Sequence, residues 1–394
     1  MSHHHHTFPI EPLTHFANAH TAIRRPREIT FFSYDEDHKY RQDASSLRYY
    51  YPPILPCDLN RGFETFRQLD DSADDHLDAL LEAIIAYETE TGSKTNTDII
   101  TWRGMMTKIM VAPYSKLDEW EMNATLFQDT LFIEENHDKK LSSRQEQSSA
   151  PRGKNAMSQD LMSFWGYKFE TVSLLPEPWS NTSREYIESR ENEIVSNYSQ
   201  YCSIVRTGLG KIKMVIGGEV DAVMDVKPDD KSLPVNWVEL KTTAAVINER
   251  EQIKFERKLL KFWAQSFLLG VPKIIVGYRS PQGILERVEE LDTQAIPDKV
   301  RLNGKGLWDG QICINVASSF LEWLKSVVTE EGVWRIRKRE KVPEIEVFKL
   351  EETGHGDILS PAFVTWRTQG LAALQSEQAT DTSAVHGVNG VKAP

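Results

Sequence analysis

The chain has 394 residues and a formal net charge of −12 at pH 7, with 40% hydrophobic and 26% charged residues. That length can bury one large core or two ordinary ones, and the composition is typical of a globular protein. No apolar run approaches the length of a membrane span and no signal peptide is visible, so we expect no membrane partner. The negative charge argues against broad electrostatic coating of nucleic acid. A nucleic-acid substrate would have to enter a locally basic groove.

Taken in chain order, the hydrophobic patterns predict a mixture of helices and strands. Helices are predicted at 75–90, 184–195, 248–269 and 316–328, and strands at 98–102, 107–112, 120–132, 167–174, 212–226, 236–241, 273–278 and 333–338. This mixture favours an α/β (α+β) fold around a mixed, largely antiparallel sheet with helices outside.

Three stretches differ in composition from the rest. Residues 1–20, which include four consecutive histidines, are expected to form a flexible N-terminal tail, and the small, polar residues 375–394 a disordered C-terminal one. Residues 136–154 are rich in Ser, Gln, Lys and Arg and are expected to form a surface excursion. Between the tails we expect a single domain, 21–374.

Two predicted strands carry charged residues at alternate positions, Glu219 and Asp221 on the first and Glu239 and Lys241 on the second. Residues two apart share a face of a strand. The segment between the strands is rich in turn residues, so a hairpin would place three carboxylates and one ammonium side by side.

Three carboxylates at close range repel one another unless they take up protons or a cation. Oxygen ligands of this kind suit Mg²⁺ or Mn²⁺. A neighbouring lysine suits phosphate chemistry, because its ammonium stabilises charge that develops in the transition state. An Asp followed after a gap by Glu-x-Lys is the active-site pattern of PD-D/E-x-K nucleases. The alternative, two ordinary solvated strand faces, stays open at this point.

The predicted helix 248–269 carries a polar stripe of Lys254, Lys258, Lys261 and Gln265. The lysines suit a solvated face. Gln265 lies near the end of the helix, where apolar residues surround it, so we expect it to be partly buried and to need a partner such as a phosphate.

Several segments resemble, in order, the motifs of the DXO-type decapping exoribonucleases. They are Thr-Trp-Arg-Gly at 101–104, Gly-Tyr-Lys-Phe-Glu at 166–170, Gly-Glu-Val-Asp at 218–221, Glu-Leu-Lys at 239–241 and the helix that bears Gln265. The segments at 23–28 and 47–53 look most like the fungal nuclear branch of that family. The resemblance spans roughly residues 20–370.

This resemblance implies two mixed sheets flanked by helices, with a PD-D/E-x-K nuclease-like core in one catalytic domain. It implies a divalent metal site, with two ions when substrate is bound. The implied ligands are Glu170, Glu219, Asp221, Glu239 and the backbone carbonyl of Leu240. Lys241 and Gln265 are implied to hold the scissile phosphate, and Arg103 to contact the RNA backbone or shape the pocket.

The family resemblance also implies an activity and partners. It implies hydrolysis at defective RNA 5′ ends: removal of pyrophosphate from triphosphate ends, of incompletely methylated caps and of NAD caps. It further implies a nuclear location and binding to the nuclear 5′→3′ exoribonuclease, with no DNA substrate.

Four alternatives stay open: a DNA nuclease, a cytoplasmic paralogue with exonuclease activity, a mainly non-catalytic stabilising subunit, and nucleotide binding through Gly208-Leu209-Gly210. That loop lacks a third glycine and a strand-loop-helix context. The basic run 335–339 could serve as a nuclear address, although its alternation indicates a strand.

Overall fold

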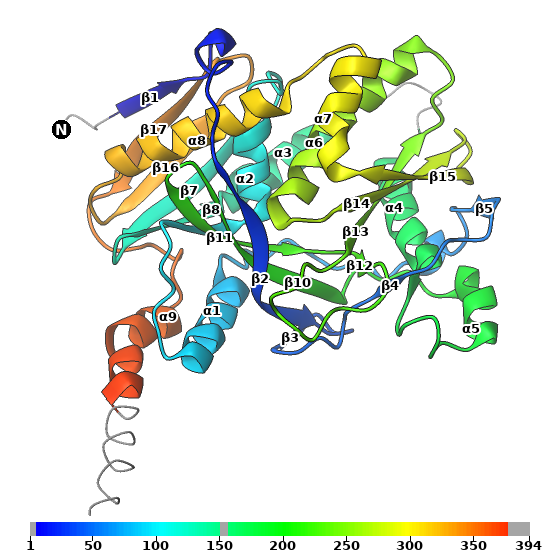
Figure 1. Cartoon of the computed structure of the whole chain (residues 1–394), viewed down its shortest axis with the longest axis horizontal. Coiled ribbons are helices and arrows are strands. Elements are labelled where there is room, and N and C mark those ends of the chain that lie inside the picture. Colours follow the sequence, from blue (N-terminus) through cyan, green and yellow to red (C-terminus); the bar gives the residue numbers. More distant parts are fainter. Residues whose placement is uncertain (1–4, 150–156, 377–394) are drawn as a thin grey trace, which may run out of the picture.

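The computed structural model describes residues 5–149 and 157–376, and within them two mixed β-sheets form the centre of the molecule (Figure 1). The larger sheet has ten strands in the order β1-β17-β16-β7-β8-β6-β11-β10-β2-β3, and the smaller has seven in the order β5-β15-β14-β13-β12-β4-β9. Most neighbours are antiparallel, but β6 runs parallel to β8 and β11, β13 to β14, and β12 to β4. The predicted class, with two mixed sheets flanked by helices, is confirmed.

The elements have the following bounds. The larger sheet contains β1 (His5–Pro9), β2 (Ile23–Tyr34), β3 (Tyr40–Arg41), β6 (Ile99–Trp102), β7 (Trp120–Phe127), β8 (Thr130–Glu135), β10 (Gln200–Leu209), β11 (Ile212–Glu219), β16 (Val333–Lys338) and β17 (Glu344–Glu351). The smaller contains β4 (Tyr49–Tyr50), β5 (Cys57–Asp58), β9 (Leu174–Leu175), β12 (Ala222–Val223), β13 (Trp237–Ala244), β14 (Lys273–Arg279) and β15 (Ile284–Asp292). The helices are α1 (Asp78–Thr91), α2 (Arg103–Val111), α3 (His137–Ser149), α4 (Gln159–Ser173), α5 (Arg184–Ser189), α6 (Glu249–Leu269), α7 (Ile296–Asp298), α8 (Gly310–Val327) and α9 (Pro361–Thr365).

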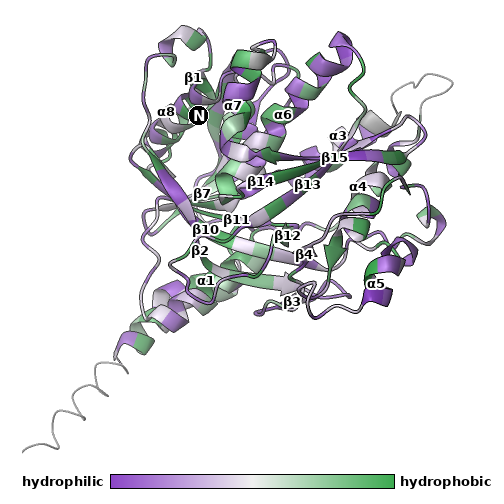
Figure 2. Cartoon of the chain, turned by 45° about the vertical axis from the view of Figure 1, so that its right-hand side comes forward, coloured by the Kyte–Doolittle hydropathy of each residue, from purple (hydrophilic) through white to green (hydrophobic). Residues whose placement is uncertain are grey.

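Helices cover both faces of the larger sheet. On one face α1 and α9 bury an apolar cluster with β2, β6, β8, β10 and β11. On the other, α2, α6 and α8 share a larger cluster that also takes in residues of β14, so one core joins the two sheets. Helix α4 packs against β13 of the smaller sheet. In Figure 2 the central strands are mostly hydrophobic, whereas α5 at the periphery is largely hydrophilic.

Helix α6 shows how local signals place an element. The Asn248 side chain accepts a hydrogen bond from the backbone N–H of Glu251 at 3.0 Å, which caps the first turn. Gly270 ends the helix with a φ of 72°, a left-handed conformation that glycine adopts without strain. The predicted helix 248–269 is therefore confirmed almost to the residue.

Two predicted strands are wrong because they are helices. Residues 107–111 belong to α2, whose buried Met106, Ile109 and Met110 recur at helical spacing, and Ala112 directly follows the helix. Residues 167–174 belong mostly to α4, where Phe164, Lys168 and Phe169 are buried along one side. The single strand predicted at 120–132 is a hairpin of β7 and β8, which turns at Gln128 and Asp129, both with positive φ.

The expected N-terminal tail is also wrong in part. Residues 5–9 form β1, which pairs with β17 along its whole length, and Phe8 is buried in the core. The predicted excursion 136–154 contains the surface helix α3 and then runs outside the described residues. The C-terminal tail lies, after Ser376, outside them as well. Within the described residues, no helix combines the length and apolar character needed to cross a bilayer.

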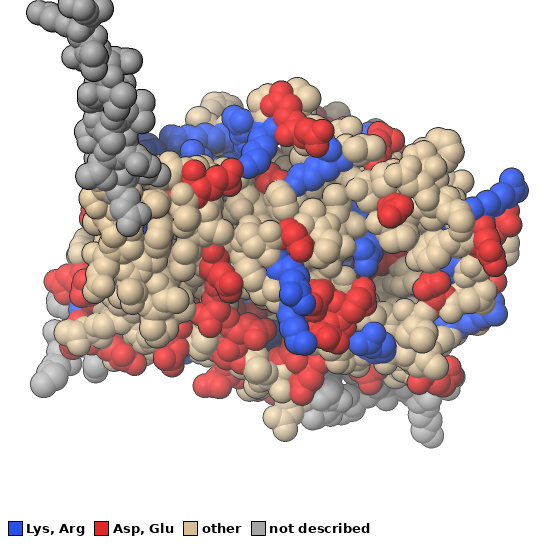
Figure 3. Space-filling view, turned by 90° about the horizontal axis from the view of Figure 1, so that it is seen from below, with Lys and Arg blue, Asp and Glu red and all other residues tan. Residues whose placement is uncertain are grey.

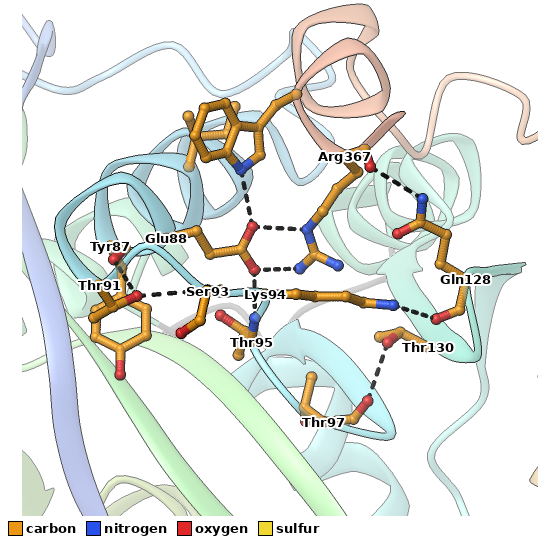
Figure 4. A network of polar contacts seen from close by, with 12 residues as sticks. Tyr87, Glu88, Thr91, Ser93, Lys94, Thr95, Thr97, Gln128, Thr130 and Arg367 are labelled. Atoms are coloured by element: carbon orange, nitrogen blue, oxygen red, sulfur yellow. Dashed lines mark hydrogen bonds and ion pairs between the residues drawn. The ribbon is translucent and has the colours of Figure 1, made fainter. Parts of the chain in front are cut away.

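A buried ion pair fixes the C-terminal segment to α1 (Figure 4). Arg367 donates two hydrogen bonds to the Glu88 carboxylate at 2.6 and 2.8 Å, and both side chains have no exposed surface. The backbone N–H of Thr95 and the indole of Trp366 also donate to Glu88, at 2.7 and 2.9 Å. The carboxylate therefore has an N–H donor on each oxygen and the guanidinium as its counter-ion.

Candidate active site

The chain crosses from the larger sheet to the smaller one at Glu219 and Asp221. Glu219 is the last residue of β11, and Asp221 lies just before β12. The single strand predicted at 212–226 is therefore wrong: it is two strands in two sheets. The predicted hairpin exists, but only β12 takes part in it, pairing Ala222 with Val238 of β13.

Glycines allow the elements around this crossing to pack closely. A Cβ at Gly217 would lie 2.8 Å from the Trp102 ring, and one at Gly218 would lie 2.8 Å from Leu269 and 3.0 Å from the Arg103 Cβ. Larger residues would push β11 away from the start of α2 and the end of α6. The two glycines thus bring Arg103 beside the strand that carries Glu219.

Glu239 is the most buried of the candidate ligands, with 1% of its surface exposed. Its two oxygens face two cations: Arg103 Nη1 donates at 3.1 Å and Lys241 Nζ at 2.5 Å. Although burial alone raises the pKa of Glu239, Arg103 and Lys241 bring it below its ordinary value. Glu239 is therefore ionised and neutralised by its partners.

In contrast to Glu239, the other three carboxylates have raised pKa values. Burial raises the pKa of Asp221 to about 7, and the negative charges of Glu239 and Glu219 add to this effect. The pKa of Glu170 is raised well above its ordinary value by burial and then by Asp221 and Glu219. The pKa of Glu219 is raised by burial as well, against the pull of Arg103. Negative charge in this cluster exceeds what Arg103 and Lys241 neutralise.

An oxygen-only set with surplus negative charge fits a hard divalent cation such as Mg²⁺ or Mn²⁺. In the arrangement observed, no three of the described His, Cys, Asp and Glu side chains are gathered closely enough to hold an ion. Glu239 turns both oxygens toward cations, and the backbone N–H of Leu240 occupies one oxygen of Asp221 at 2.6 Å. Reorientation of these side chains would free the oxygens for a metal.

One cavity is lined by three of the carboxylates, and a second lies beside α2 and α6. The smaller, about 260 Å³, is lined by Glu170, Glu219 and Asp221 together with Arg48 and several tyrosines. The larger, about 560 Å³, is lined by Gly104, Gln265, four lysines and six carboxylates, and three of those lysines form ion pairs with carboxylates of the same wall. Gly104, in the wall of the larger cavity, directly follows Arg103, whose guanidinium contacts Glu239.

The structure brings most predicted site residues together, but from other elements than expected. Glu170 comes from α4 rather than from a strand. Gln265 is half-buried on α6, as predicted, and lines the larger cavity. Its amide has no hydrogen-bond partner within residues 5–149 and 157–376. Arg48 was not singled out from the sequence, because it lies beside β12 only through the pairing of β4 with β12.

Two other sequence features have structural roles. Gly208 and Leu209 end β10 and Gly210 turns the chain into β11, so the candidate nucleotide loop is a hairpin turn. The basic run at 335–339 lies largely in β16, where Arg335 pairs with Glu121 and Arg337 with Glu346.

Comparison with known proteins gives consistent results. The family model "RAI1 like PD-(D/E)XK nuclease" matches residues 24–364. A protein of Aspergillus fumigatus named Decapping nuclease RAI1 is 60% identical over 363 residues, which cover 92% of this chain and 99% of the relative. The structure of Candida albicans Rai1 in complex with pU5-Mn²⁺ matches with a TM-score of 0.85 and 33% identity, covering 94% of this chain and all of that one. Scheffersomyces stipitis Rai1 in complex with (3′-NADP)⁺ and calcium ion matches with a TM-score of 0.79 and 30% identity, covering 89% and 97%.

Proposed function

Because the chain belongs to the RAI1 like PD-(D/E)XK nuclease family, we propose that it is a divalent-metal-dependent hydrolase that acts on defective RNA 5′ ends. Its substrates are RNAs with a 5′-triphosphate, an incompletely methylated cap or an NAD cap. The observation that carries this proposal is a buried cluster in which the charges of Glu170, Glu219, Asp221, Glu239 and Lys241 act on one another. Related structures hold pU5 with Mn²⁺ and (3′-NADP)⁺ with calcium, which supports both the RNA and the NAD-cap substrates.

The charged residues divide the work of phosphate hydrolysis. Glu170, Glu219, Asp221, Glu239 and the Leu240 carbonyl would hold Mg²⁺ or Mn²⁺, which polarises a phosphoryl oxygen and activates water when bound. Lys241 then donates to the scissile phosphate and stabilises the charge that grows there. Arg103 orients Glu239 and supplies a second fixed positive charge. Gln265, with its free amide, would donate to the scissile phosphate together with Lys241.

We further propose that the protein works in the nucleus as a partner of the nuclear 5′→3′ exoribonuclease, which it supplies with 5′-monophosphate RNA. The motif resemblance to the fungal nuclear branch of the family supports this role. Co-purification of the two proteins from nuclear extract, with a longer thermal lifetime of the exoribonuclease in the complex, is the expected result. Absence of a complex at micromolar concentrations would contradict the proposed partnership, and the protein would then act without the exoribonuclease.

One assay tests the activity. The protein is incubated with Mg²⁺ or Mn²⁺ and matched RNAs that carry triphosphate, unmethylated-cap, methylated-cap, NAD or monophosphate ends. We expect hydrolysis of the triphosphate, unmethylated-cap and NAD ends, and resistance of the mature cap. Equal cleavage of a matched DNA would favour a general nuclease, and lack of any cleavage would favour a stabilising subunit.

A further inference from the structure

The smaller cavity has an unusual charge pattern. It is lined by Glu170, Glu219 and Asp221 of the carboxylate cluster and by two further acids, Glu36 and Glu193. Arg48 is the only lysine or arginine among the described residues that line the cavity. Glu170, Glu219 and Asp221 are candidate metal ligands. Elsewhere in the wall of the cavity, Arg48 supplies the positive charge.

Hydrogen bonds hold the backbone around Arg48 in place, close to the candidate metal ligands. Its backbone carbonyl accepts a hydrogen bond from the N–H of Val223 at 3.0 Å, two residues after Asp221. Ser46, two residues earlier, is buried; its hydroxyl donates to the Tyr34 carbonyl at 2.7 Å and accepts from the Ser199 hydroxyl at 2.9 Å. Arg48 therefore holds a fixed position relative to Asp221.

The guanidinium itself is only loosely held. Its contacts to Glu36, Ser199 and the Leu47 carbonyl are all 3.4 Å long, at the limit of a hydrogen bond. The Glu36 side chain is 64% exposed, and ion pairs with such exposed groups contribute little. A phosphate could replace these contacts at small cost, and it would gain the stronger, bidentate geometry that arginine offers to phosphate oxygens.

Aromatic side chains complete the cavity. Tyr167 and Tyr186 are half-buried and line it together with Arg48. An aromatic ring beside a guanidinium suits a nucleotide, because the ring stacks on the base while the cation binds the phosphates. Small-molecule pockets usually measure roughly 300–1,000 Å³. At about 260 Å³ this cavity suits a pyrophosphate or a single nucleotide rather than a length of RNA.

We propose, on the basis of the function proposed above, that this cavity receives the group released from the RNA 5′ end, with Arg48 on its phosphates and Tyr186 on its base. In hydrolysis the water oxygen bonds to the attacked phosphorus and the bond to the leaving oxygen breaks. That oxygen keeps the electron pair and takes up a proton, and for a triphosphate end it leaves as pyrophosphate.

The first test compares substrate and product. Arg48→Ala is expected to lower kcat/KM for pyrophosphate release from a 5′-triphosphate RNA at least tenfold. Binding of the matched 5′-monophosphate RNA, which lacks the leaving group, should change less than twofold, and so should Mn²⁺ affinity. Arg48→Lys should recover part of the loss. Arg184→Ala removes another arginine, on α5, whose side chain is 89% exposed, and should behave as wild type.

The second test uses the chemistry of the leaving group. Pyrophosphate has no ring, whereas a cap carries bases. Tyr186→Ala should therefore slow release of an unmethylated cap at least fivefold and leave pyrophosphate release within twofold of wild type. If Arg48→Ala fails to fold, Arg48→Gln, which keeps an amide donor toward Ser199, takes its place.

The outcomes separate this inference from the proposed function. Wild-type protein that hydrolyses neither triphosphate nor capped RNA overturns the proposed function. Active wild type with an equally active Arg48→Ala overturns the leaving-group site alone. Equal losses on triphosphate and monophosphate RNA would show that Arg48 binds the RNA body instead, which also overturns it.

Discussion

Glu239 and Asp221 are neighbours with different electrostatic surroundings, so their substitution has different effects on stability. Glu239 neutralises Arg103 and Lys241, and its removal leaves two cations without their partner. Asp221 carries a charge that the folded protein disfavours, as its raised pKa shows. We predict that Glu239→Ala and Asp221→Asn both abolish hydrolysis, since each removes a candidate metal ligand.

The two variants should differ in metal-free thermal unfolding. Glu239→Ala is expected to lower Tm, whereas Asp221→Asn should hold or raise it, because the amide oxygen can still accept from Leu240 N–H. Calorimetry without divalent metal makes the comparison. Near-normal turnover in either folded variant would remove that residue from the site.

Lys241 and Gln265 are predicted to serve the phosphate rather than the metal. Lys241→Ala and Gln265→Ala should reduce turnover on the order of a hundredfold, as loss of a charge-stabilising donor does. Metal affinity should fall far less. Metal titration by calorimetry beside single-turnover kinetics separates the effects, and a large loss of metal affinity with normal turnover at saturating metal would contradict these roles.

At the scale of elements, the sequence correctly predicted those helices and strands whose ends are set by residues close by in the chain. The capping residue Asn248 and the terminal Gly270 define α6 in the sequence as they do in the structure. Segment 107–112 fails because its short alternation Thr-Lys-Ile-Met-Val-Ala fits a strand. Its burial against α6 and α8, which only the folded chain provides, selects the helix.

The candidate site was predictable to a similar degree. The spacing of Glu219, Asp221, Glu239 and Lys241 indicated their meeting, because residues two apart share a strand face. The crossing between sheets was not predictable, since the glycines before it, Gly217 and Gly218, lie inside β11 and Val220 is as buried as a strand residue. Arg48 was out of reach because its neighbour β12 is more than 170 positions away in the sequence.

The buried pair of Glu88 and Arg367 joins α1 to the C-terminal segment and gives a stability prediction away from the site (Figure 4). Arg367→Met leaves a buried carboxylate without its cation, which typically costs about 3–5 kcal/mol. Chemical denaturation should show this loss, with kcat unchanged well below Tm. The double variant Glu88→Leu/Arg367→Met should be more stable than Arg367→Met alone, so purely additive losses would contradict the ion-pair account.

Strand β15 carries a carboxylate whose titration should be visible in acid. Although burial opposes it, hydrogen bonds from Lys299, Arg287 and Tyr278 lower the pKa of Glu289 from 4.5 to about 2. A lowered pKa means that the folded state binds the proton more weakly, so this contribution is present above pH 4.5 and is lost as pH falls toward 2. Glu289→Gln should flatten the stability profile in that window only. Denaturant midpoints from pH 2 to 7 check this, and parallel profiles for variant and wild type would contradict it.

At the scale of the whole molecule, the net charge of −12 offers no general attraction to RNA. In the face shown in Figure 3, acidic side chains gather over the lower half, and lysines and arginines occur in smaller groups. The carboxylate cluster itself repels a triphosphate until a cation reverses its sign. We predict that binding of a 5′-triphosphate RNA depends steeply on divalent metal and only modestly on RNA length.

Fluorescence anisotropy with RNAs of increasing length, each with Mn²⁺ and with a chelator, measures both dependences. A matched RNA with a 5′-hydroxyl end serves as the control and should bind weakly in both conditions. Tight metal-free binding that grows with length would instead identify a general RNA-binding subunit.

The crossing at Glu219 and Asp221 gives an ion at this point a mechanical role as well as a chemical one. Glu219 closes a strand of one sheet, Asp221 leads into the other, and Glu170 belongs to a helix that packs on the second. An ion shared among them would bind the two sheets to each other, in addition to their apolar packing and the ion pair of Arg103 with Glu239. At a hundred times its Kd such an ion adds about 2.7 kcal/mol to the folded state. The metal ion that serves hydrolysis would then also fix the distance between the two sheets. Loss of the metal would therefore weaken the arrangement of the sheets that positions the substrate.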